Sequence, residues 1–147
     1  MTQFVYNDGG RAESGFKGKA GDCVCRAISI ITNEPYESVH NRLANGNHSQ
    51  RKSSRQKTQR PRSADHGILV KRKWFKDYMK ELGFTWVPTM KIGQGCKVHL
   101  RSEELPEGRI VVSVSKHLTA MIDGVIHDTH DPSRDGTRCV YGYWIYN

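Results

Sequence analysis

Three side chains in this sequence could together form a nucleophilic site, although they come from distant parts of the chain. Cys23 follows a Gly-Asp pair and begins an apolar run, "CVCRAISIIT". A cysteine in the first turn of a helix lies beside backbone N–H groups that have no acceptor within the helix, at the positive end of the helix dipole. Because this setting favours the thiolate, it lowers the pKa of the thiol and makes Cys23 a candidate nucleophile.

The other two side chains lie in "HLTAMIDGVIHD", residues 117–128. Asp123-Gly124 between two apolar runs predicts a β-hairpin with a two-residue turn. With that turn, Thr119 lies opposite Asp128. Side chains alternate along a strand, so His117 and Asp128 share one face as diagonal neighbours within reach of each other.

A histidine supported by a carboxylate is what a cysteine nucleophile requires. The histidine takes the thiol proton and later gives it to the leaving group, and the carboxylate orients the imidazole and stabilises its cation. We therefore expect Cys23, His117 and Asp128 to form a catalytic triad. Cys25 points to a different side of the helix, so only one of the two cysteines can face the histidine. The alternative is that both are small buried residues of a helix core.

The order of these residues resembles the papain-like cysteine peptidase superfamily. The layout is closest to compact bacterial members such as the bacteriocin leader peptidases, in which a cysteine helix is followed by a late hairpin from His to Asp-Pro, here "KHLTAMIDGVIHDTHDPS". The stretch from "GDC" to "GTRCVYGYW" also resembles a group of phage-encoded proteins. The resemblance implies a papain-like fold and a hydrolase that cuts a peptide or protein substrate through a thioester, with Cys23 as nucleophile, His117 as general base and Asp128 as orienting acid.

One feature of the superfamily is missing from this chain. Papain-like enzymes place a glutamine shortly before the cysteine, where it binds the oxyanion, but "FKGKAGD" contains none. The backbone N–H of Cys23 could donate to the oxyanion instead. Candidates for the side-chain donor are Tyr6, Asn7, Lys17 and Lys19, and the sequence does not choose among them.

The surrounding pattern predicts helices first and strands afterwards. Apolar spacing predicts a helix over 23–32 with Asp22 as N-cap, a second in "NEPYESVHNRLANG" that ends near Gly46, and a third in "VKRKWFKDYMKELGF" that ends at Gly83. Residues 1–22 are expected to form an extended arm and loop. Strands are predicted in "FTWVP", "KVHL", "RIVVSVS", "HLTAMI", "VIHDTH" and "CVYGYW". This order favours one α+β domain over residues 1–147, with N-terminal helices packed on a C-terminal antiparallel sheet.

The positive charge is concentrated in one insert, "RKSSRQKTQRPR". Its basic residues are Arg51, Lys52, Arg55, Lys57, Arg60 and Arg62, and without these six the net charge falls from +8 to +2. The insert, about 47–66, has too few apolar residues to pack and is expected to be mobile. It supports a rival function, a non-enzymatic phage-encoded protein that binds nucleic acid or an acidic host factor by charge. No aromatic residues are interleaved for base stacking.

Composition also predicts the compartment and the absence of cofactors. No apolar run approaches the ~18 residues of a membrane span, and no signal peptide is visible at the N-terminus. We expect a cytoplasmic protein without a membrane partner, in the host cytoplasm if phage-encoded, with Cys23, Cys25, Cys96 and Cys139 reduced. His127 and His130 fall on opposite strand faces, and Cys-x-Cys is not the usual zinc spacing, so neither a metal nor another cofactor is expected.

Overall fold

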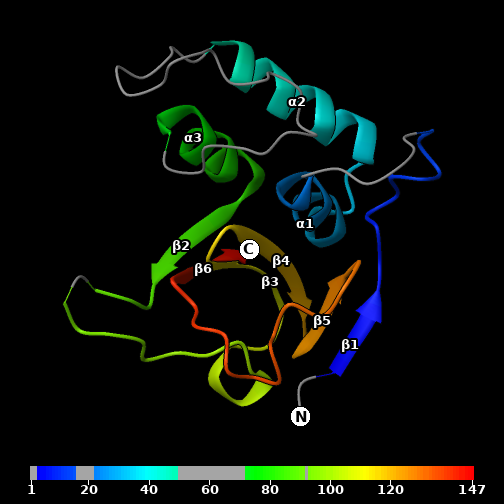
Figure 1. Cartoon of the computed structure of the whole chain (residues 1–147). Helices are drawn as coiled ribbons and strands as arrows, with labels where there is room; N and C mark the ends of the chain where they lie inside the picture. Colours follow the sequence, from blue (N-terminus) through cyan, green and yellow to red (C-terminus); the bar gives the residue numbers. More distant parts are fainter. Residues whose placement is uncertain (1–2, 16–21, 50–71, 92) are drawn as a thin grey trace, which may run out of the picture.

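The computed structural model describes residues 3–15, 22–49, 72–91 and 93–147, and within them the fold is α+β (Figure 1). A six-stranded mixed sheet has the order β1-β5-β4-β3-β6-β2. Three α-helices accompany it in the described ranges. In chain order the elements are β1 (Gln3–Tyr6), α1 (Cys23–Thr32), α2 (Tyr36–Ser49), α3 (Lys73–Leu82), β2 (Phe84–Pro88), the 3₁₀ turn η1 (Ser102–Glu104), β3 (Arg109–Val114), β4 (His117–Ile122), β5 (Val125–Asp128) and β6 (Gly142–Tyr146).

Helix α1 begins at Cys23 and packs against β4, as its apolar spacing leads one to expect. Val24, Ala27, Ile28 and Ile31 recur at i, i+3, i+4 and i+7, and all four are buried. The helix ends where Asn33 adopts a left-handed conformation, with φ of 61°. Helix α2 packs across α1 on the side away from the sheet (Figure 1).

Asp22 is the N-cap residue of α1 as predicted, whereas the predicted end of the second helix is wrong. Asp22 precedes α1, but among the described residues its carboxylate makes no capping hydrogen bond and pairs instead with Arg11 and Arg26. Helix α2 continues through Gly46 to Ser49. A Cβ atom at Gly46 would lie 2.1 Å from the Trp74 ring of α3, so this glycine permits close helix packing rather than ending a helix.

The third helix ends as predicted, and the first three residues of the expected mobile insert are helical. Gly83 closes α3 with φ of 98°. Residues 47–49 of the expected mobile insert belong to α2. The remainder of the insert, with all six of its basic residues, lies outside the described residues.

The hairpin from β4 to β5 has the predicted turn. Asp123 and Gly124 both have positive φ, 48° and 81°, as a two-residue turn of this kind requires. Ile122 pairs with Val125, which sets the expected register. Strands β3, β4 and β5 therefore run antiparallel, and β6 and β2 continue the antiparallel pairing beyond β3.

The N-terminal arm is a strand, which corrects the prediction of a purely antiparallel sheet. Strand β1 pairs in parallel with β5, from Gln3 opposite Val125 to Tyr6 opposite Asp128. Two other strand predictions are also wrong. "KVHL" contributes only an isolated bridge from His99 to Cys139, and the last strand begins at Gly142, after "CVY".

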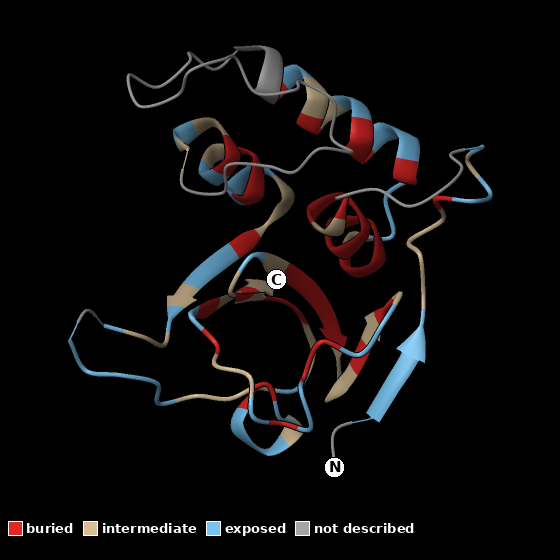
Figure 2. Ribbon diagram, viewed as in Figure 1, coloured by how far each residue is buried: buried red, intermediate tan, exposed pale blue. Residues whose placement is uncertain are grey.

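Buried hydrophobic residues form two clusters. Figure 2 shows buried positions along α1 and along the strands of the sheet. Val111 and Ala120 face the helices, where they join Ile28 and Ile31 in one cluster. Residues on the opposite face, such as Met121, pack beneath the loops in a second cluster. Its buried members are Leu100, Leu105, Ile110, Val112, Val114, Met121, Ile126 and Val140.

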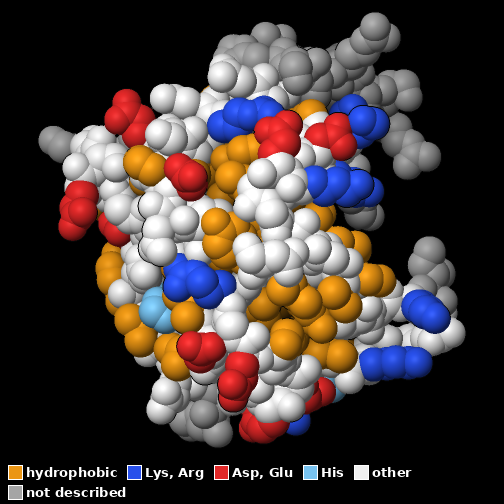
Figure 3. All heavy atoms as spheres, turned by 180° about the vertical axis from the view of Figure 1, so that it is seen from behind, with side chains coloured by type: hydrophobic (Ala, Val, Ile, Leu, Met, Phe, Trp, Pro, Cys, Tyr) orange, Lys and Arg blue, Asp and Glu red, His pale blue; other side chains and the backbone are white. Residues whose placement is uncertain are grey.

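Hydrophobic side chains also reach the surface. Figure 3 shows them gathered over the lower half of the rear face. Among the described residues, the large hydrophobic side chains that are exposed are Phe4, Val5, Tyr6, Trp86 and Tyr141. No described helix combines the length and apolar character needed to cross a bilayer.

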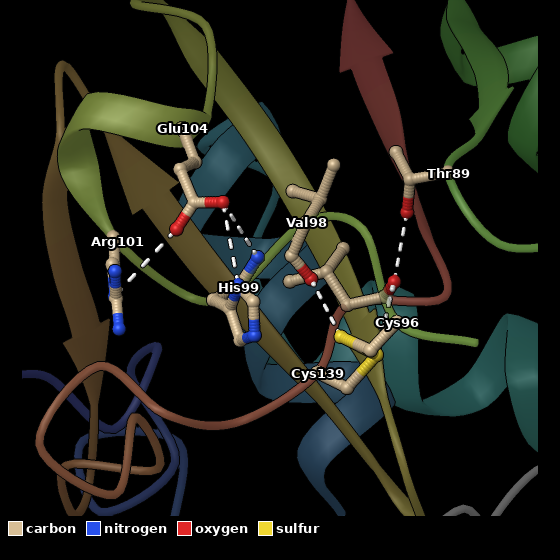
Figure 4. Close-up of a disulfide and its surroundings, with 8 residues drawn as sticks. Thr89, Cys96, Val98, His99, Arg101, Glu104 and Cys139 are labelled. Carbon is tan, nitrogen blue, oxygen red and sulfur yellow. Dashed lines mark hydrogen bonds and ion pairs between the residues drawn. A yellow bond between two sulfur atoms is a disulfide. The ribbon is translucent and has the colours of Figure 1, made fainter.

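Cys96 and Cys139 form a disulfide, which corrects the expectation that both are reduced packing residues (Figure 4). Their Cα atoms lie 5.8 Å apart. The two loop segments run side by side because Val140 N–H donates to the carbonyl of Val98 at 2.8 Å and Leu100 N–H to that of Arg138 at 2.9 Å. This long-range pairing brings the sulfurs together. Neither Cys23 nor Cys25 belongs to a disulfide.

Candidate active site

The first residue of α1, the first residue of β4 and the last residue of β5 meet at one place. The Cys23 thiol and the His117 ring lie close enough that each shifts the pKa of the other. The Nε2 atom of His117 lies 2.7 Å from Oδ2 of Asp128. Because Nε2 faces the carboxylate, Nδ1 is the ring nitrogen left for the sulfur. The structure thus brings together the three residues that the sequence singled out.

The electrostatics of Cys23 and His117 favour an ion pair. Burial alone would raise the pKa of the Cys23 thiol, but the hydrogen bond and the charge of His117, assisted by the Leu118 N–H and the charge of Arg26, lower it overall. Burial would likewise lower the pKa of His117, but its hydrogen bonds to Asp128 and Cys23 raise it to about 9. Both shifts favour a thiolate beside an imidazolium.

Asp128 is held as a buried carboxylate, with only 3% of the residue exposed. Besides His117, its Oδ2 accepts a hydrogen bond from the Thr119 hydroxyl at 2.7 Å. Its Oδ1 accepts from the Thr129 N–H at 2.7 Å and from Nη2 of Arg26 at 3.4 Å. Burial would raise the pKa of Asp128, but the hydrogen bond and charge of His117 and the hydrogen bonds from Thr119 and the Thr129 N–H lower it. Asp128 can therefore stabilise the imidazolium.

The neighbouring cysteine and histidine have different surroundings. Cys25 is fully buried, and its thiol donates to the carbonyl of Tyr36 in α2 at 3.7 Å, so Cys23 rather than Cys25 faces the histidine. The ring of His130 lies 5.1 Å from that of His117, as the hairpin register predicts. Its Nδ1 is 4.0 Å from Oδ1 of Asp128, but 58% of the His130 side chain is exposed. His130 therefore borders the site from the solvent side.

The oxyanion candidates fall in different places. The Asn7 amide lies 3.4 Å from Nδ1 of His127, and its oxygen accepts from the Gly9 N–H. Tyr6 pairs with Asp128 across the strands and is 68% exposed. Paired residues share a face of the sheet, so Tyr6 is on the Asp128 side and Asn7 is on the side of His127. Lys17 and Lys19 lie outside the described residues.

Sequence reasoning missed one contact of the site and used another only for register. Arg26 was not singled out, although it is the one charged residue of "CVCRAISIIT", and a charge within an apolar helix is seldom buried without a partner. Thr119 was placed opposite Asp128 only to set the register. Its hydroxyl makes that pairing a hydrogen bond between the side chains.

Two further expectations concern binding. Within the described ranges, no three His, Cys, Asp or Glu side chains are grouped so that they could hold a metal ion. The basic residues from Arg51 to Arg62 lie outside those ranges, so the binding surface expected there has no described geometry.

Comparison with known proteins finds no match among protein-family models, curated proteins or solved structures. The functional conclusion therefore rests on the site itself.

Proposed function

We propose that this protein is a cysteine-dependent hydrolase that cleaves a peptide or related amide bond, with a papain-like arrangement of Cys23, His117 and Asp128. The observation that supports this proposal best is the arrangement of the three residues. His117 is bonded to Asp128 at 2.7 Å and lies close enough to the Cys23 thiol that each shifts the pKa of the other. A phage origin and a cytoplasmic location belong to the same proposal, although the Cys96–Cys139 disulfide argues against that location, because disulfides are rare in the cytosol.

Acylation uses the charges that the site already holds. The Cys23 thiolate attacks the amide carbonyl carbon, and a C–S bond forms while the carbonyl electrons move onto the oxygen. The N–H groups in the first turn of α1, including that of Cys23, lack acceptors within the helix and are suited to bind this oxyanion. His117 then donates its proton to the leaving nitrogen, the C–N bond breaks and a thioester remains.

Deacylation reverses the proton transfer. Neutral His117 takes a proton from a water molecule, whose oxygen attacks the thioester carbonyl. The C–S bond breaks, the carboxylic acid leaves, and the thiolate–imidazolium pair is restored. Asp128 stays ionised throughout and orients the ring. If an amine replaces water, the same atoms catalyse an acyl transfer.

Alkylation by iodoacetamide, followed by mass spectrometry, tests the nucleophile. We expect Cys23 to be alkylated below pH 7.5 at least about tenfold faster than a free small-molecule thiol, since the thiolate is the reactive form. The buried Cys25 is an internal control and should react slowly. His117→Ala should remove the advantage of Cys23. Alkylation of Cys23 no faster than the free thiol would exclude an activated nucleophile.

The rival proposal, a non-enzymatic protein that binds nucleic acid or an acidic partner, depends on the basic insert. Deletion of residues 51–62 separates the two functions. For a hydrolase, this deletion should leave the alkylation rate of Cys23 unchanged. For a binder, it should abolish a strongly salt-dependent retention on immobilised polynucleotide, because that retention depends on basic side chains.

A further inference from the structure

Arg26 connects the proposed site to a second buried carboxylate. One guanidinium nitrogen, Nη1, pairs with Oδ1 of Asp22, and the other, Nη2, lies 3.4 Å from Oδ1 of Asp128. Only 10% of the Arg26 side chain is exposed. A guanidinium is a rigid planar fork, so fixing one nitrogen also fixes the direction of the other.

The Asp22 end of this connection is itself fixed. Asp22 is 1% exposed. Its Oδ2 accepts hydrogen bonds from the Tyr36 hydroxyl at 2.5 Å and from Nη1 of Arg11 at 3.1 Å. Burial and the adjacent Asp22 raise the pKa of Tyr36, so the hydroxyl stays protonated and donates. Arg26 therefore pairs with a carboxylate whose rotation is restricted by Tyr36 and Arg11.

The two oxygens of Asp128 have separate tasks. Oδ2 receives His117 and Thr119, whereas Oδ1 receives Arg26 and the Thr129 N–H. A rotation of the carboxylate that moved Oδ2 away from His117 would also break the contact with Arg26. The orientation of Asp128 thus depends on Arg26, which contacts the carboxylate on the oxygen that does not face His117.

We propose that Arg26 is a positioning residue of this site, whose guanidinium, anchored on Asp22, holds Asp128 so that the carboxylate presents Oδ2 to His117. This inference rests on the proposed function, because it assigns Arg26 a part in orienting the imidazole that serves the Cys23 thiolate. Arg26 itself does not touch the reacting atoms.

The charges form an alternating series through the protein interior. With Cys23 as thiolate and His117 as imidazolium, anions and cations alternate from the thiolate to Arg11. Removing one member leaves a buried neighbour without its partner, which is costly.

Several charged or titratable groups surround Asp128 and could affect these titrations. They are Cys23 and Arg26 from α1, His117 from β4, His130 after β5, and Arg138 before β6, with Asp22 and Arg11 behind Arg26.

Two substitutions separate the position of Arg26 from its charge. Arg26→Gln removes both, whereas Arg26→Lys keeps the charge but lacks the fork that spans two carboxylates. The first measurement is the pH titration of the His117 ring by NMR. The second is the rate of Cys23 alkylation by iodoacetamide as a function of pH. Arg109→Gln is the matched control. Arg109 also contacts α1, but it donates to the carbonyls of Ile30 and Ile31 at the C-terminal end of that helix, away from Cys23.

If Arg26 has a positioning role, the pKa of His117 should be about one unit lower in both Arg26 variants than in the wild type. This is the effect of losing one charge-assisted hydrogen bond. Only Arg26→Gln should also move the acid limb of Cys23 alkylation to higher pH, because only it removes the cation. Arg109→Gln should change neither. If Arg26→Gln does not fold, Arg26→Lys alone decides the question through the NMR titration.

A His117 pKa in Arg26→Lys equal to that of the wild type would overturn the positioning role. A positive charge at position 26, without the planar guanidinium, would then be enough to maintain the pKa of His117. Loss of thermal stability with an unchanged His117 titration would also overturn it, because the role would be structural. Failure of the proposed function has a different signature, in which the wild-type Cys23 is unreactive and His117 titrates near its ordinary pKa. A reactive wild type with unaltered Arg26 variants refutes only the inference about Arg26.

Discussion

The imidazole of His117 lies between two anions, and this explains its altered titration. Asp128 and the Cys23 thiolate each stabilise the protonated ring, so the pKa of His117 is raised to about 9 despite burial. Because the pKa of His117 is higher in the folded state than in the unfolded state, its protonation stabilises the fold. This stabilisation is fully present at pH values below about 6.5, the pKa of histidine in the unfolded chain. This contribution to the free energy of unfolding is then lost as the pH rises from there through about 9.

Cys23→Ala should lower the pKa of His117, because it removes one of the two anionic partners. The hydrogen bond to Asp128 remains, so the change should be partial. The stability linked to this histidine should then be lost at a lower pH than in the wild type. NMR titration of the His117 ring, together with urea unfolding at pH 6.5 and pH 9, measures both effects.

Cys25→Ala is the matched control for this substitution. It removes a thiol from the same helix, but Cys25 is buried against the core, away from the histidine. It should lower the overall stability and leave the His117 titration in place. An unchanged titration in Cys23→Ala would mean that the sulfur does not stabilise the imidazolium.

At the scale of the elements, features with a local signal in the sequence could be predicted. The apolar spacing after Cys23 has a helical period, and Asp123-Gly124 is a turn that sets its own register. Together they place Cys23 at a helix start and His117 beside Asp128. The packing of α1 on β4 then brings the two parts of the site together.

Features that depend on distant parts of the chain could not be predicted in this way. Strand β1 pairs in parallel with β5, near the other end of the sequence, and no turn between them signals the pairing. The disulfide of Cys96 likewise depends on two loops that meet only in the folded protein. Gly46 was expected to end a helix because glycine often follows the last turn of one. In the structure a glycine is needed there because the Trp74 ring of α3 packs against it.

Gly46→Ala should destabilise the protein through the contact between α2 and α3. Alanine normally stabilises a helix relative to glycine by about 1 kcal/mol. Here its Cβ would lie 2.1 Å from the Trp74 ring, and such overpacking costs about 1–3 kcal/mol. We expect a net decrease in the free energy of unfolding, measured by chemical denaturation.

Asn45→Ala tests whether helix propensity alone explains the result. Asn45 is the neighbouring residue of α2 and is exposed, so alanine there should change stability by a few tenths of a kcal/mol at most in the favourable direction. Stabilisation by Gly46→Ala comparable to that of an ordinary exposed helix position would contradict the close packing.

On the scale of the whole molecule, the sheet separates two hydrophobic clusters that are covered in different ways. Helix α1 covers one face with regular side-chain packing, whereas loops that include η1 cover the other. A covalent link between two such loops stabilises the fold mainly by restricting the unfolded chain. The Cys96–Cys139 disulfide lies in this layer, beside the contact between the His99 ring and the Glu104 carboxyl group (Figure 4).

Replacing both Cys96 and Cys139 by serine should therefore destabilise the fold without disabling the proposed site. The disulfide closes a loop with a sequence separation of 43 residues, for which loop-closure entropy predicts a loss of roughly 2–4 kcal/mol in the free energy of unfolding. The site residues come from α1, β4 and β5, so Cys23 alkylation under native conditions should keep its wild-type rate. Urea unfolding and iodoacetamide labelling of the same variant measure the two quantities. A loss of Cys23 reactivity in a protein that is still folded would show that the loop layer and the site are coupled through the sheet.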